Sequence, residues 1–400
     1  MVDLSTLSQL YEALVLAFLL SFLAIVAVNL IVLPRLDHFR LPAGRPPPRV
    51  AVLIPARNEE ANIEAALRSL LAQDYSNYEV WLYEDDSTDS TYRIAARLAE
   101  HDLRLHIVKG TTQPPPGWLG KANACYLLYE TMRAAEEPDY ILFTDADVRF
   151  APGALARAVA AAGATGSGLL SVFPRQITLS WAERLAVPML LHWAVYTFLP
   201  LQLAFSRRTG PIFAAANGQF MLFTREAYEA CGGHTSVRAE ILEDVALARA
   251  VKASGYSSIL ADGAALVRTR MYNGPAEVWR GYSKNVFSFF NYTPLYLALG
   301  VVVLLALYVV PIFSIAYGAF TGSGAMLSWG AAQYSAAVLA RLLIAARFRY
   351  RQIDVLLHPL AVLFLIAICL NSMRWWLTGQ GAWKGRAFTP EENQRPRGEG

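Results

Sequence analysis

Residues 140–147 read Tyr-Ile-Leu-Phe-Thr-Asp-Ala-Asp (YILFTDAD), an apolar run that ends in the carboxylates Asp145 and Asp147. The run predicts a buried strand, and the two acids stand at its carboxyl end. Both carboxylates can turn toward one hard cation, because Mg²⁺ and Mn²⁺ take carboxylate oxygens and keep positions for substrate oxygens and water. The motif is short, but its place after a buried strand makes it specific. We therefore predict a metal site at Asp145 and Asp147.

The segments upstream of this strand alternate short apolar runs with helical patterns. Further strand candidates are Val50–Pro55 (VAVLIP), Glu79–Tyr83 (EVWLY) and Leu105–Val108. The segment from Asn58 through Leu71 predicts a helix, with Asn58 as its N-cap and apolar residues at helical spacing. This alternation, which extends over about residues 49–284, predicts an α/β domain.

A second acidic cluster directly follows the strand candidate Glu79–Tyr83. It consists of Glu84, Asp85, Asp86 and Asp89 (EDDSTD). Ligands of parallel α/β sheets bind at the carboxyl ends of the strands, so both acidic clusters are placed for one site. Taken alone, the second cluster is equally compatible with a solvated turn.

A third acidic pair, Glu243-Asp244, opens a predicted helix. Two interpretations stay open. The carboxylates stabilise the first turn through the helix dipole, or one of them is a general base that accepts a proton from an acceptor.

Two further segments are candidates for binding a phosphorylated sugar. Pro114–Lys121 (PPPGWLGK) predicts a rigid turn that presents Lys121 to a phosphate, the alternative being a surface lysine without a specific partner. Ala216–Phe220 (ANGQF) places small and amide groups where a sugar can approach the backbone, the alternative being a simple turn.

The composition is too apolar for an ordinary soluble domain, with 55% hydrophobic residues, 17% charged residues and a mean hydropathy of +0.31. Four apolar runs are long enough to span a bilayer: about Leu14–Leu33, Leu295–Ala316, Met326–Ala345 and Val355–Leu377. The first run is not a typical signal peptide, because Asp3 and Glu12 precede it and no small-residue cleavage site follows.

The arginines beside these runs predict the orientation of a multi-pass protein of the inner cell membrane. Arg35, Arg40, Arg45 and Arg49 follow the first run, so we expect a cytoplasmic catalytic domain. Arg347, Arg349 and Arg351 predict a cytoplasmic loop. Four spans would place the tail outside, although its basic residues Lys384, Arg386, Arg395 and Arg397 favour the inside. A re-entrant or interfacial run would resolve this conflict.

A fifth apolar stretch, Leu185–Phe205, lies inside the catalytic region and is interrupted by Pro188, His192, Pro200 and Gln202. A span there would put the second half of the catalytic domain across the membrane. We expect an interfacial element, with Trp193 and Tyr196 at headgroup depth. A buried core helix is the alternative.

Charge and cysteine content exclude other classes. Lys+Arg (35) and Asp+Glu (32) nearly balance at a net charge of +3, and no basic block indicates nucleic-acid binding. The three cysteines, Cys125, Cys231 and Cys369, are far apart and lack the spacing of a zinc site, so we expect reduced thiols.

Taken together, the motifs resemble the family 2 glycosyltransferases with the GT-A fold, in particular bacterial membrane members of carotenoid and hopanoid lipid pathways. The matching segments are IPARNEE (54–60), EDDSTD (84–89), GWLGKANA (117–124), FTDAD (143–147), ANGQF (216–220), GGH (232–234), EDVALA (243–248) and RGYSKNVF (280–287). The resemblance covers about residues 49–290 and the flanking spans.

This resemblance implies a Rossmann-like nucleotide-sugar-binding domain and an inverting single displacement from a nucleotide-sugar donor, of the UDP-sugar type, to a membrane lipid acceptor. Donor-binding residues would be Pro55, Arg57, Glu59, Asp85, Lys121 and Asp145, with Asp85 on the base. Asp145 and Asp147 would hold Mg²⁺ or Mn²⁺ on the diphosphate. Asp244 would be the base that activates an acceptor hydroxyl or carboxyl.

The sequence departs from the family pattern in two places. Glu84 stands where many members have aspartate, which leaves its role open. The QxxRW signature of processive synthases is absent, and Arg280, Lys284 and Asn285 stand near its place. We therefore expect a non-processive enzyme.

Two alternative functions are weighed against this one. A nucleotidyltransferase would carry a glycine-rich loop where Ala56-Arg57-Asn58-Glu59 stand. An inactive membrane scaffold would have lost at least one acidic cluster, whereas all three are intact.

We accordingly predict the following organisation: a membrane anchor at 1–34, a proline-rich linker at 35–48, a GT-A catalytic domain at 49–290, a membrane region of about three helices at 291–378 and a polar tail at 379–400.

Overall fold

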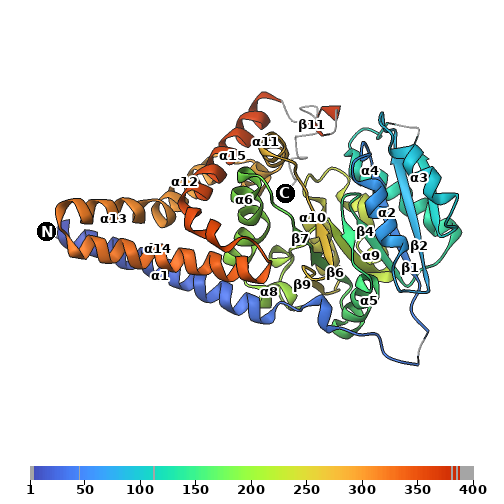
Figure 1. Cartoon of the computed structure of the whole chain (residues 1–400), viewed down its shortest axis with the longest axis horizontal. Helices are drawn as coiled ribbons and strands as arrows, with labels where there is room; N and C mark the ends of the chain where they lie inside the picture. The colour runs from blue at the N-terminus through green and yellow to red at the C-terminus, as the bar shows by residue number, and fades with distance from the viewer. Residues whose placement is uncertain (1–3, 45, 111–112, 380–381, 384–385, 388–400) are drawn as a thin grey trace. The chain divides into compact units, whose positions relative to one another are not determined.

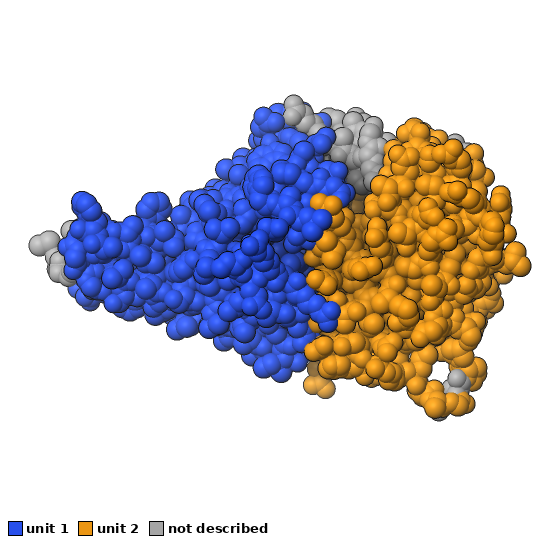
Figure 2. All heavy atoms as spheres, in the orientation of Figure 1, with its two compact units in different colours: residues 1–32, 178–201, 272–381 blue, residues 33–177, 202–271, 382–400 orange. Residues whose placement is uncertain are grey.

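The computed structural model describes residues 4–44, 46–110, 113–379, 382–383 and 386–387. The chain forms two compact units (Figure 2). A helical unit comprises residues 1–32, 178–201 and 272–381, and a sheet unit comprises residues 33–177, 202–271 and 382–400. Residues 178–201 and 272–290, which we placed in the catalytic domain, thus group with the apolar helices. Most of the polar tail lies outside the described residues.

A seven-stranded mixed sheet forms the centre of the sheet unit (Figure 1). Its strands, in spatial order, are β3 (Leu105–Gly110), β2 (Tyr78–Asp85), β1 (Val50–Ala56), β4 (Tyr140–Thr144), β8 (Phe220–Thr224), β6 (Leu169–Phe173) and β9 (Ser258–Asp262). Strand β8 is antiparallel to its neighbours β4 and β6, and the other pairs are parallel. The four strand candidates from the sequence are confirmed.

The strand order reverses at β1, since β2 and β3 lie on one side of it and β4 on the other. In open α/β sheets a ligand crevice forms outside the carboxyl ends of the strands at such a reversal. Because β2 and β4 are both parallel to β1, the loops after these three strands lie at one edge of the sheet.

Helices cover both faces of this sheet. They are α2 (Ile63–Leu71), α3 (Thr91–Ala99), α4 (Gly120–Ala135), α5 (Ala154–Thr165), α9 (Arg225–Ala230) and α10 (Glu243–Ala253). Successive side chains of β1 point to opposite faces, as the strand pleat requires. Val50, Val52 and Ile54 pack into a core shared with α2, α3 and α5, whereas Ala51 and Leu53 pack into a second core with α4 and α10.

Short elements complete the sheet unit. A small sheet contains β5 (Arg149–Phe150), β10 (Val267–Thr269) and β7 (Arg175–Gln176), and β11 (Ala382–Trp383) pairs with β12 (Arg386–Ala387). Single turns of helix are η1 (Leu36–His38), η3 (Pro211–Phe213) and η4 (Gly233–Val237), and α8 (Leu201–Phe205) lies where the chain passes between the units.

The predicted helix start at Asn58 is wrong. Helix α2 begins at Ile63 with Asn62 as its N-cap residue. Asn58 has a left-handed backbone (φ 53°), and its side-chain oxygen accepts a hydrogen bond from Thr88 N at 2.9 Å. The side chain that resembled a helix cap therefore joins two loops instead.

The helical unit consists of α1 (Leu4–Val32), α6 (Trp181–Pro188), the π-turn η2 (Met189–Trp193), α7 (Ala194–Phe198), α11 (Pro275–Ser283), η5 (Val286–Phe290), α12 (Pro294–Tyr308), α13 (Val310–Thr321), α14 (Gly324–Arg347), η6 (Gln352–Leu357) and α15 (His358–Thr378). In Figure 1, α14 runs alongside both α1 and α13. Pro311 lacks the N–H that would continue the helix, which accounts for the break between α12 and α13.

Three segments among the described residues are long and apolar enough to cross a membrane: Thr6–Val32, Pro294–Thr321 and Gln352–Thr378. The predicted run Met326–Ala345 forms α14 but is not among them. This helix buries the polar side chains of Gln333 and Arg341, which lower its hydropathy.

Two buried polar residues of α1 are satisfied within the helical unit. The Glu12 carboxylate accepts hydrogen bonds from Gln333 Nε2 (2.6 Å) and Ser314 Oγ (3.3 Å). Asn29 donates to the carbonyl oxygens of Tyr196 and Leu199, each at 2.8 Å, and accepts from Leu201 N at 2.8 Å.

The interfacial placement of Trp193 and Tyr196 is wrong, because both side chains are buried inside the helical unit. The Trp193 ring packs edge-on against Phe198 and Tyr308, and the Tyr196 ring packs against Phe348. Pro188 removes a backbone donor just before the π-turn, where the regular α-helical hydrogen bonding is interrupted. The burial of Trp193 and Tyr196 agrees instead with the alternative, a buried core helix.

Candidate active site

The loop after β1 and the loop after β2 are joined by a network of hydrogen bonds at the carboxyl edge of the sheet. Asn58 N donates to Ser87 Oγ at 3.1 Å, and Glu59 N donates to Thr91 Oγ1 at 2.7 Å. Both loops contain a left-handed residue, Asn58 and Asp86 (φ 54°), a conformation that Asn and Asp tolerate better than most residues. The network holds the two predicted donor-binding motifs as one rigid surface.

Arg57 and Asp85 meet at this edge. The Arg57 guanidinium donates to the backbone oxygen of Asp85, and its Nη1 lies 4.0 Å from a carboxylate oxygen of both Asp85 and Asp86. Asp85 is buried at the end of β2, and Pro55 lies one strand over in β1. The structure therefore brings together three of the residues that we expected to line a nucleotide pocket.

Glu84, whose role the sequence left open, stabilises the loop that follows it. Its carboxylate is buried, and Oε1 accepts a hydrogen bond from Ser87 N at 2.6 Å. The longer glutamate side chain reaches back to the turn, so this acid supports the loop that carries Asp85.

Asp145 and Asp147 differ in their surroundings. Asp145 Oδ1 pairs with Lys121 Nζ at 2.8 Å, whereas Asp147 Oδ2 accepts a hydrogen bond from Thr269 Oγ1 at 2.9 Å. Burial, and to a smaller extent the charges of Asp145 and Glu59, together raise the pKa of Asp147 to about 7, against the opposing effect of the Thr269 hydrogen bond. The negative charge of Asp145 and Asp147 at the end of β4 is therefore not fully balanced by the neighbouring groups.

Lys121 lies between two acidic clusters. Its Nζ is 2.8 Å from Asp145 and 2.8 Å from Glu243 Oε1. Burial opposes the charge of this ammonium, but attraction to the two carboxylates outweighs it and raises the pKa of Lys121 well above its ordinary value. Lys121 thus remains a cation that joins the end of β4 to the start of α10.

Asp244 stands at the first turn of α10, as the sequence predicted. Its Oδ2 accepts from Gly218 N at 2.9 Å, and its Oδ1 accepts from Val245 N at 2.8 Å. Burial and repulsion from Glu243 outweigh the two backbone hydrogen bonds and the charge of Lys121, and the pKa of Asp244 is raised to about 6. A carboxylate with a pKa near 6 can accept a proton at neutral pH, as a general base requires.

Asp145 and Asp147 fit a divalent cation by their donor chemistry and their excess negative charge. No group of three or more His, Cys, Asp or Glu side chains with metal-site geometry occurs in the described part of the chain. Two protein carboxylates leave the other oxygen positions of a Mg²⁺ or Mn²⁺ ion to substrate and water, which is the usual arrangement for phosphate-bound Mg²⁺.

Two contributors to the site were missed from the sequence. Gly218 was noted only for its small size, yet an added Cβ there would lie 3.5 Å from both Lys121 Nζ and Asp244 Cβ. Thr269, which contacts Asp147, carries no local sequence signal, because β10 reaches the site only through the small second sheet.

Part of the chain is similar in sequence to known glycosyltransferases. Residues 51–232 match the family model described as Glycosyl transferase family 2. The 4,4'-diaponeurosporenoate glycosyltransferase of Staphylococcus aureus is 30% identical over 240 residues, which cover 59% of this chain. The match spans 60% of the length of that relative.

A solved structure shows the same fold over most of the chain. The mannosyltransferase of Pyrobaculum calidifontis, in complex with GDP-Man and Mn²⁺, has a TM-score of 0.50 and 19% sequence identity. The likeness covers 90% of this chain and 99% of the other. The mixed sheet and its helices therefore have the GT-A arrangement, as the sequence predicted.

Proposed function

Because residues 51–232 match the model of glycosyl transferase family 2, we propose that this chain is a member of that family and transfers a sugar from a nucleotide-sugar donor to a lipid-like acceptor in a membrane. The observation that carries the proposal is the joining of Asp145, Lys121, Glu243 and Asp244 at the carboxyl edge of the sheet. This arrangement supports a diphosphate-binding role for the end of β4, next to a carboxylate that can accept a proton.

We propose that the joined loops after β1 and β2 bind the nucleotide. The Asp85 carboxylate would accept hydrogen bonds from the base, and Arg57 keeps that carboxylate in place from the neighbouring loop. Pro55 and Glu59 would line the same pocket from the loop after β1. A uridine diphosphate sugar is the donor that we expect.

Asp145 and Asp147 would hold a divalent cation through their carboxylate oxygens. A bound Mg²⁺ or Mn²⁺ supplies positive charge to the departing nucleoside diphosphate. The under-compensated charge at Asp147 and the fold shared with a mannosyltransferase solved with GDP-Man and Mn²⁺ support this proposal. Lys121, whose Nζ lies 2.8 Å from Asp145, would pair with a phosphate oxygen of the donor.

Asp244 would accept the proton of the acceptor hydroxyl or carboxyl as that oxygen attacks the sugar. A single displacement of this kind breaks the bond to the diphosphate on the opposite face and inverts the configuration. Hydrogen bonds from Gly218 N and Val245 N orient the Asp244 carboxylate.

The lipid-like nature of the acceptor is proposed from a relative and from the apolar segments. The relative in Staphylococcus aureus is named for glycosylation of 4,4'-diaponeurosporenoate. Three apolar segments long enough to span a membrane support an acceptor of comparable, lipid-like character for this chain. We expect one sugar to be added per acceptor.

The test is a transfer assay with the full chain purified in detergent. Nucleotide sugars and a membrane lipid extract are supplied, and mass spectrometry searches for a lipid that gains the mass of one sugar. Transfer should require Mg²⁺ or Mn²⁺, stop with EDTA and be lost in Asp147→Asn. The exposed Asp74→Asn should retain activity as the matched control. Transfer that is unaffected by EDTA and by Asp147→Asn would remove the metal-assisted mechanism, and no sugar adduct with any donor would remove the function.

A further inference from the structure

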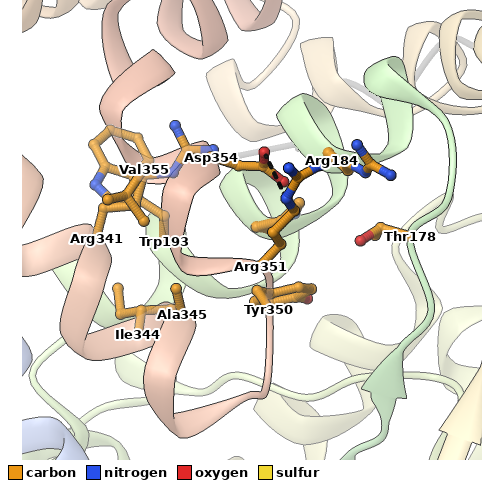
Figure 3. Close-up of a pocket in the computed structure, with 11 residues that line it drawn as sticks. Thr178, Arg184, Trp193, Arg341, Ile344, Ala345, Tyr350, Arg351, Asp354 and Val355 are labelled. Carbon is orange, nitrogen blue, oxygen red and sulfur yellow. Dashed lines mark ion pairs between the residues drawn. The ribbon is translucent and has the colours of Figure 1, made fainter.

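The enclosed polar groups of the two units differ in what they adjoin. In the helical unit, the space lined by Arg184, Arg341 and Asp354 has a volume of about 10 Å³, room for about one water molecule (Figure 3). Such a space is too small for a substrate or a lipid head. In the sheet unit, buried polar groups instead surround the loop 217–219, which contacts the proposed base.

The loop 217–219 presents a backbone donor to that base. Gly218 N donates a hydrogen bond to Asp244 Oδ2 at 2.9 Å. A donor of this kind favours the charged form of a carboxylate, and here it is one of the groups that lower the pKa of Asp244. Because the donor is a backbone N–H, its position depends on what holds the residues on either side of Gly218.

The residue before Gly218 is held from strand β6. Asn217 N donates to Ser171 Oγ at 2.7 Å, and Ser171 Oγ donates to Asn217 O at 3.3 Å. Both residues are buried. Asn217 Oδ1 also accepts a hydrogen bond from Gln219 N at 3.0 Å, which closes the turn around Gly218. The hydroxyl of Ser171 therefore fixes the first residue of the loop on the sheet.

The residue after Gly218 is held from strand β4 and by two amide groups. Thr144 Oγ1 donates to Gln219 O at 2.8 Å. The side-chain oxygen of Gln219 accepts from Gln176 Nε2 at 2.7 Å and from Asn217 Nδ2 at 3.3 Å. Thr144 and Gln219 are 1% and 2% exposed, so removal of one partner leaves the other without a substitute from water.

Thr144 also links this loop to the proposed metal-binding end of β4. It is the last residue of that strand and directly precedes Asp145. One hydroxyl thus connects the strand end that would carry the cation with the loop that contacts Asp244. The transfer reaction needs both groups at the correct separation, since a misplacement of about 1 Å can cost about 10²-fold in rate.

We propose that Thr144 and Ser171 are positioning residues for the general base: through the loop 217–219 they hold a backbone donor against Asp244. The loop leads into β8, which lies between β4 and β6, so each neighbouring strand supplies one of the two hydroxyls. The inference rests on the proposed transfer reaction, in which Asp244 accepts the proton of the acceptor.

Paired substitutions of Thr144 test the role of its hydroxyl in the full chain in detergent. Thr144→Val keeps the shape and removes the donor, whereas Thr144→Ser keeps the donor. We expect kcat for sugar transfer to fall about tenfold to hundredfold in Thr144→Val and to recover in Thr144→Ser. The Kd of UDP, titrated in the presence of Mn²⁺, should change little, because the hydroxyl holds the loop at the base.

The pH profile separates positioning from a general loss of activity. The Gly218 hydrogen bond lowers the pKa of Asp244, so a loosened loop should move the acid limb of kcat/KM to a higher pH. We expect this shift in Thr144→Val and also in Ser171→Ala, which loosens the loop from the other strand. The substitutions leave in place the charged side chains that act on Asp244, namely Glu243 and Lys121.

Hydrogen exchange with mass spectrometry tests the loop without turnover. The peptide that contains residues 216–220 should exchange faster in Thr144→Val and in Ser171→Ala than in the wild type. Thr131→Val is the matched control, since it removes an exposed hydroxyl of α4 that bonds to its own helix. This variant should leave the exchange, kcat and the acid limb unchanged. If Thr144→Val does not fold, Ser171→Ala provides the same three readouts.

Three results would overturn the inference. The first is exchange of the loop that neither substitution changes, and the second is a faster-exchanging loop with wild-type kcat and acid limb. The third is loss of UDP and Mn²⁺ binding in Thr144→Val with a normal Ser171→Ala, which would assign the effect to Asp145. Each of these leaves the proposed transfer intact, whereas a wild-type chain that transfers no sugar would remove the proposed function and this inference with it.

Discussion

At the scale of single residues, the acids at the carboxyl edge of the sheet differ in proton affinity, and their neighbours explain the difference. Burial and Glu243 raise the pKa of Asp244 to about 6, while burial, Asp145 and Glu59 raise the pKa of Asp147 to about 7. Asp244 has two backbone donors that favour its charged form. Asp147 has one hydroxyl donor, from Thr269. The surroundings of Asp244 suit a general base. The surroundings of Asp147 suit a metal ligand, whose negative charge would be balanced when the cation binds together with the substrate.

The base assignment predicts the acid side of the pH profile. Asp244 must be ionised to accept a proton, so kcat/KM should rise as the pH increases through about 6. Asp244→Asn keeps the shape but cannot accept the proton, and kcat should fall by about 10² to 10⁴, the usual contribution of general base catalysis.

Glu243→Gln is the matched variant, since adjacent residues of a helix point about 100° apart and cannot serve the same acceptor oxygen. Its effect should be smaller, and the donor Kd should change little in Asp244→Asn. Normal turnover in Asp244→Asn with a dead Glu243→Gln would reverse the assignment.

Lys121 offers an independent check on the same carboxylate. Its positive charge lowers the pKa of Asp244, so Lys121→Met should move the acid limb of kcat/KM to a higher pH. Lys109→Met, an exposed lysine of β3, should leave the limb in place. A pH profile of Lys121→Met that coincides with wild type would show that Asp244 is not the group titrating in the profile.

At the scale of elements, hydrogen bonds of single asparagine side chains connect segments that are distant in sequence. Asn58 in the loop after β1 reaches the loop after β2, and Asn29 in α1 reaches the break between α7 and α8. Each asparagine satisfies backbone groups that a turn leaves without partners. An irregular segment is thus held in place by one side chain from a regular element or a neighbouring loop.

Asn29 allows a stability prediction. Asn29→Leu keeps the volume and removes three hydrogen bonds, which average about 0.6 kcal/mol each within membrane proteins. We expect the free energy of unfolding to fall by about 2 kcal/mol. Thermal unfolding of the detergent-solubilised full chain measures this, with the exposed Asn273→Leu as control. Equal thermal midpoints for the two variants would contradict a structural role for Asn29.

At the scale of the whole molecule, the predicted site residues and the candidate membrane spans belong to different units. All the predicted donor, metal and base residues belong to the sheet unit, and the three candidate spans belong to the helical unit. Nucleotide sugars are cytoplasmic metabolites, and the arginines after the first and third apolar runs favour the cytoplasmic side. We therefore propose that the sheet unit faces the cytoplasm.

Two introduced cysteines test this orientation. Ser76 is exposed in the sheet unit, and Thr321 is exposed at the turn between the antiparallel helices α13 and α14. In intact cells Ser76→Cys should resist a membrane-impermeant thiol reagent, and Thr321→Cys should react. The three native cysteines are buried and should contribute little background. Ready labelling of Ser76→Cys together with protection of Thr321→Cys would reverse the proposed topology.

The sequence alone determined the α/β core and the acidic strand ends, because both depend on local patterns. Apolar runs of four to eight residues specify strands, and acids just beyond them must lie at the carboxyl edge. Tyr140–Thr144 was predicted residue for residue, and α10 begins at Glu243 as expected. The first apolar run likewise predicted α1, since composition alone decides membrane compatibility.

Only the tertiary structure decided where side chains with several possible partners are directed. Asn58 resembles a helix cap in sequence, but a loop 30 residues away captures its oxygen. Trp193 and Tyr196 have the composition of an interfacial helix, yet aromatic rings from distant helices bury them. Lys121 joins Asp145 to Glu243, and Thr269 meets Asp147, through contacts that no local pattern encodes. Such contacts depend on how distant segments pack, which periodicity and composition do not specify.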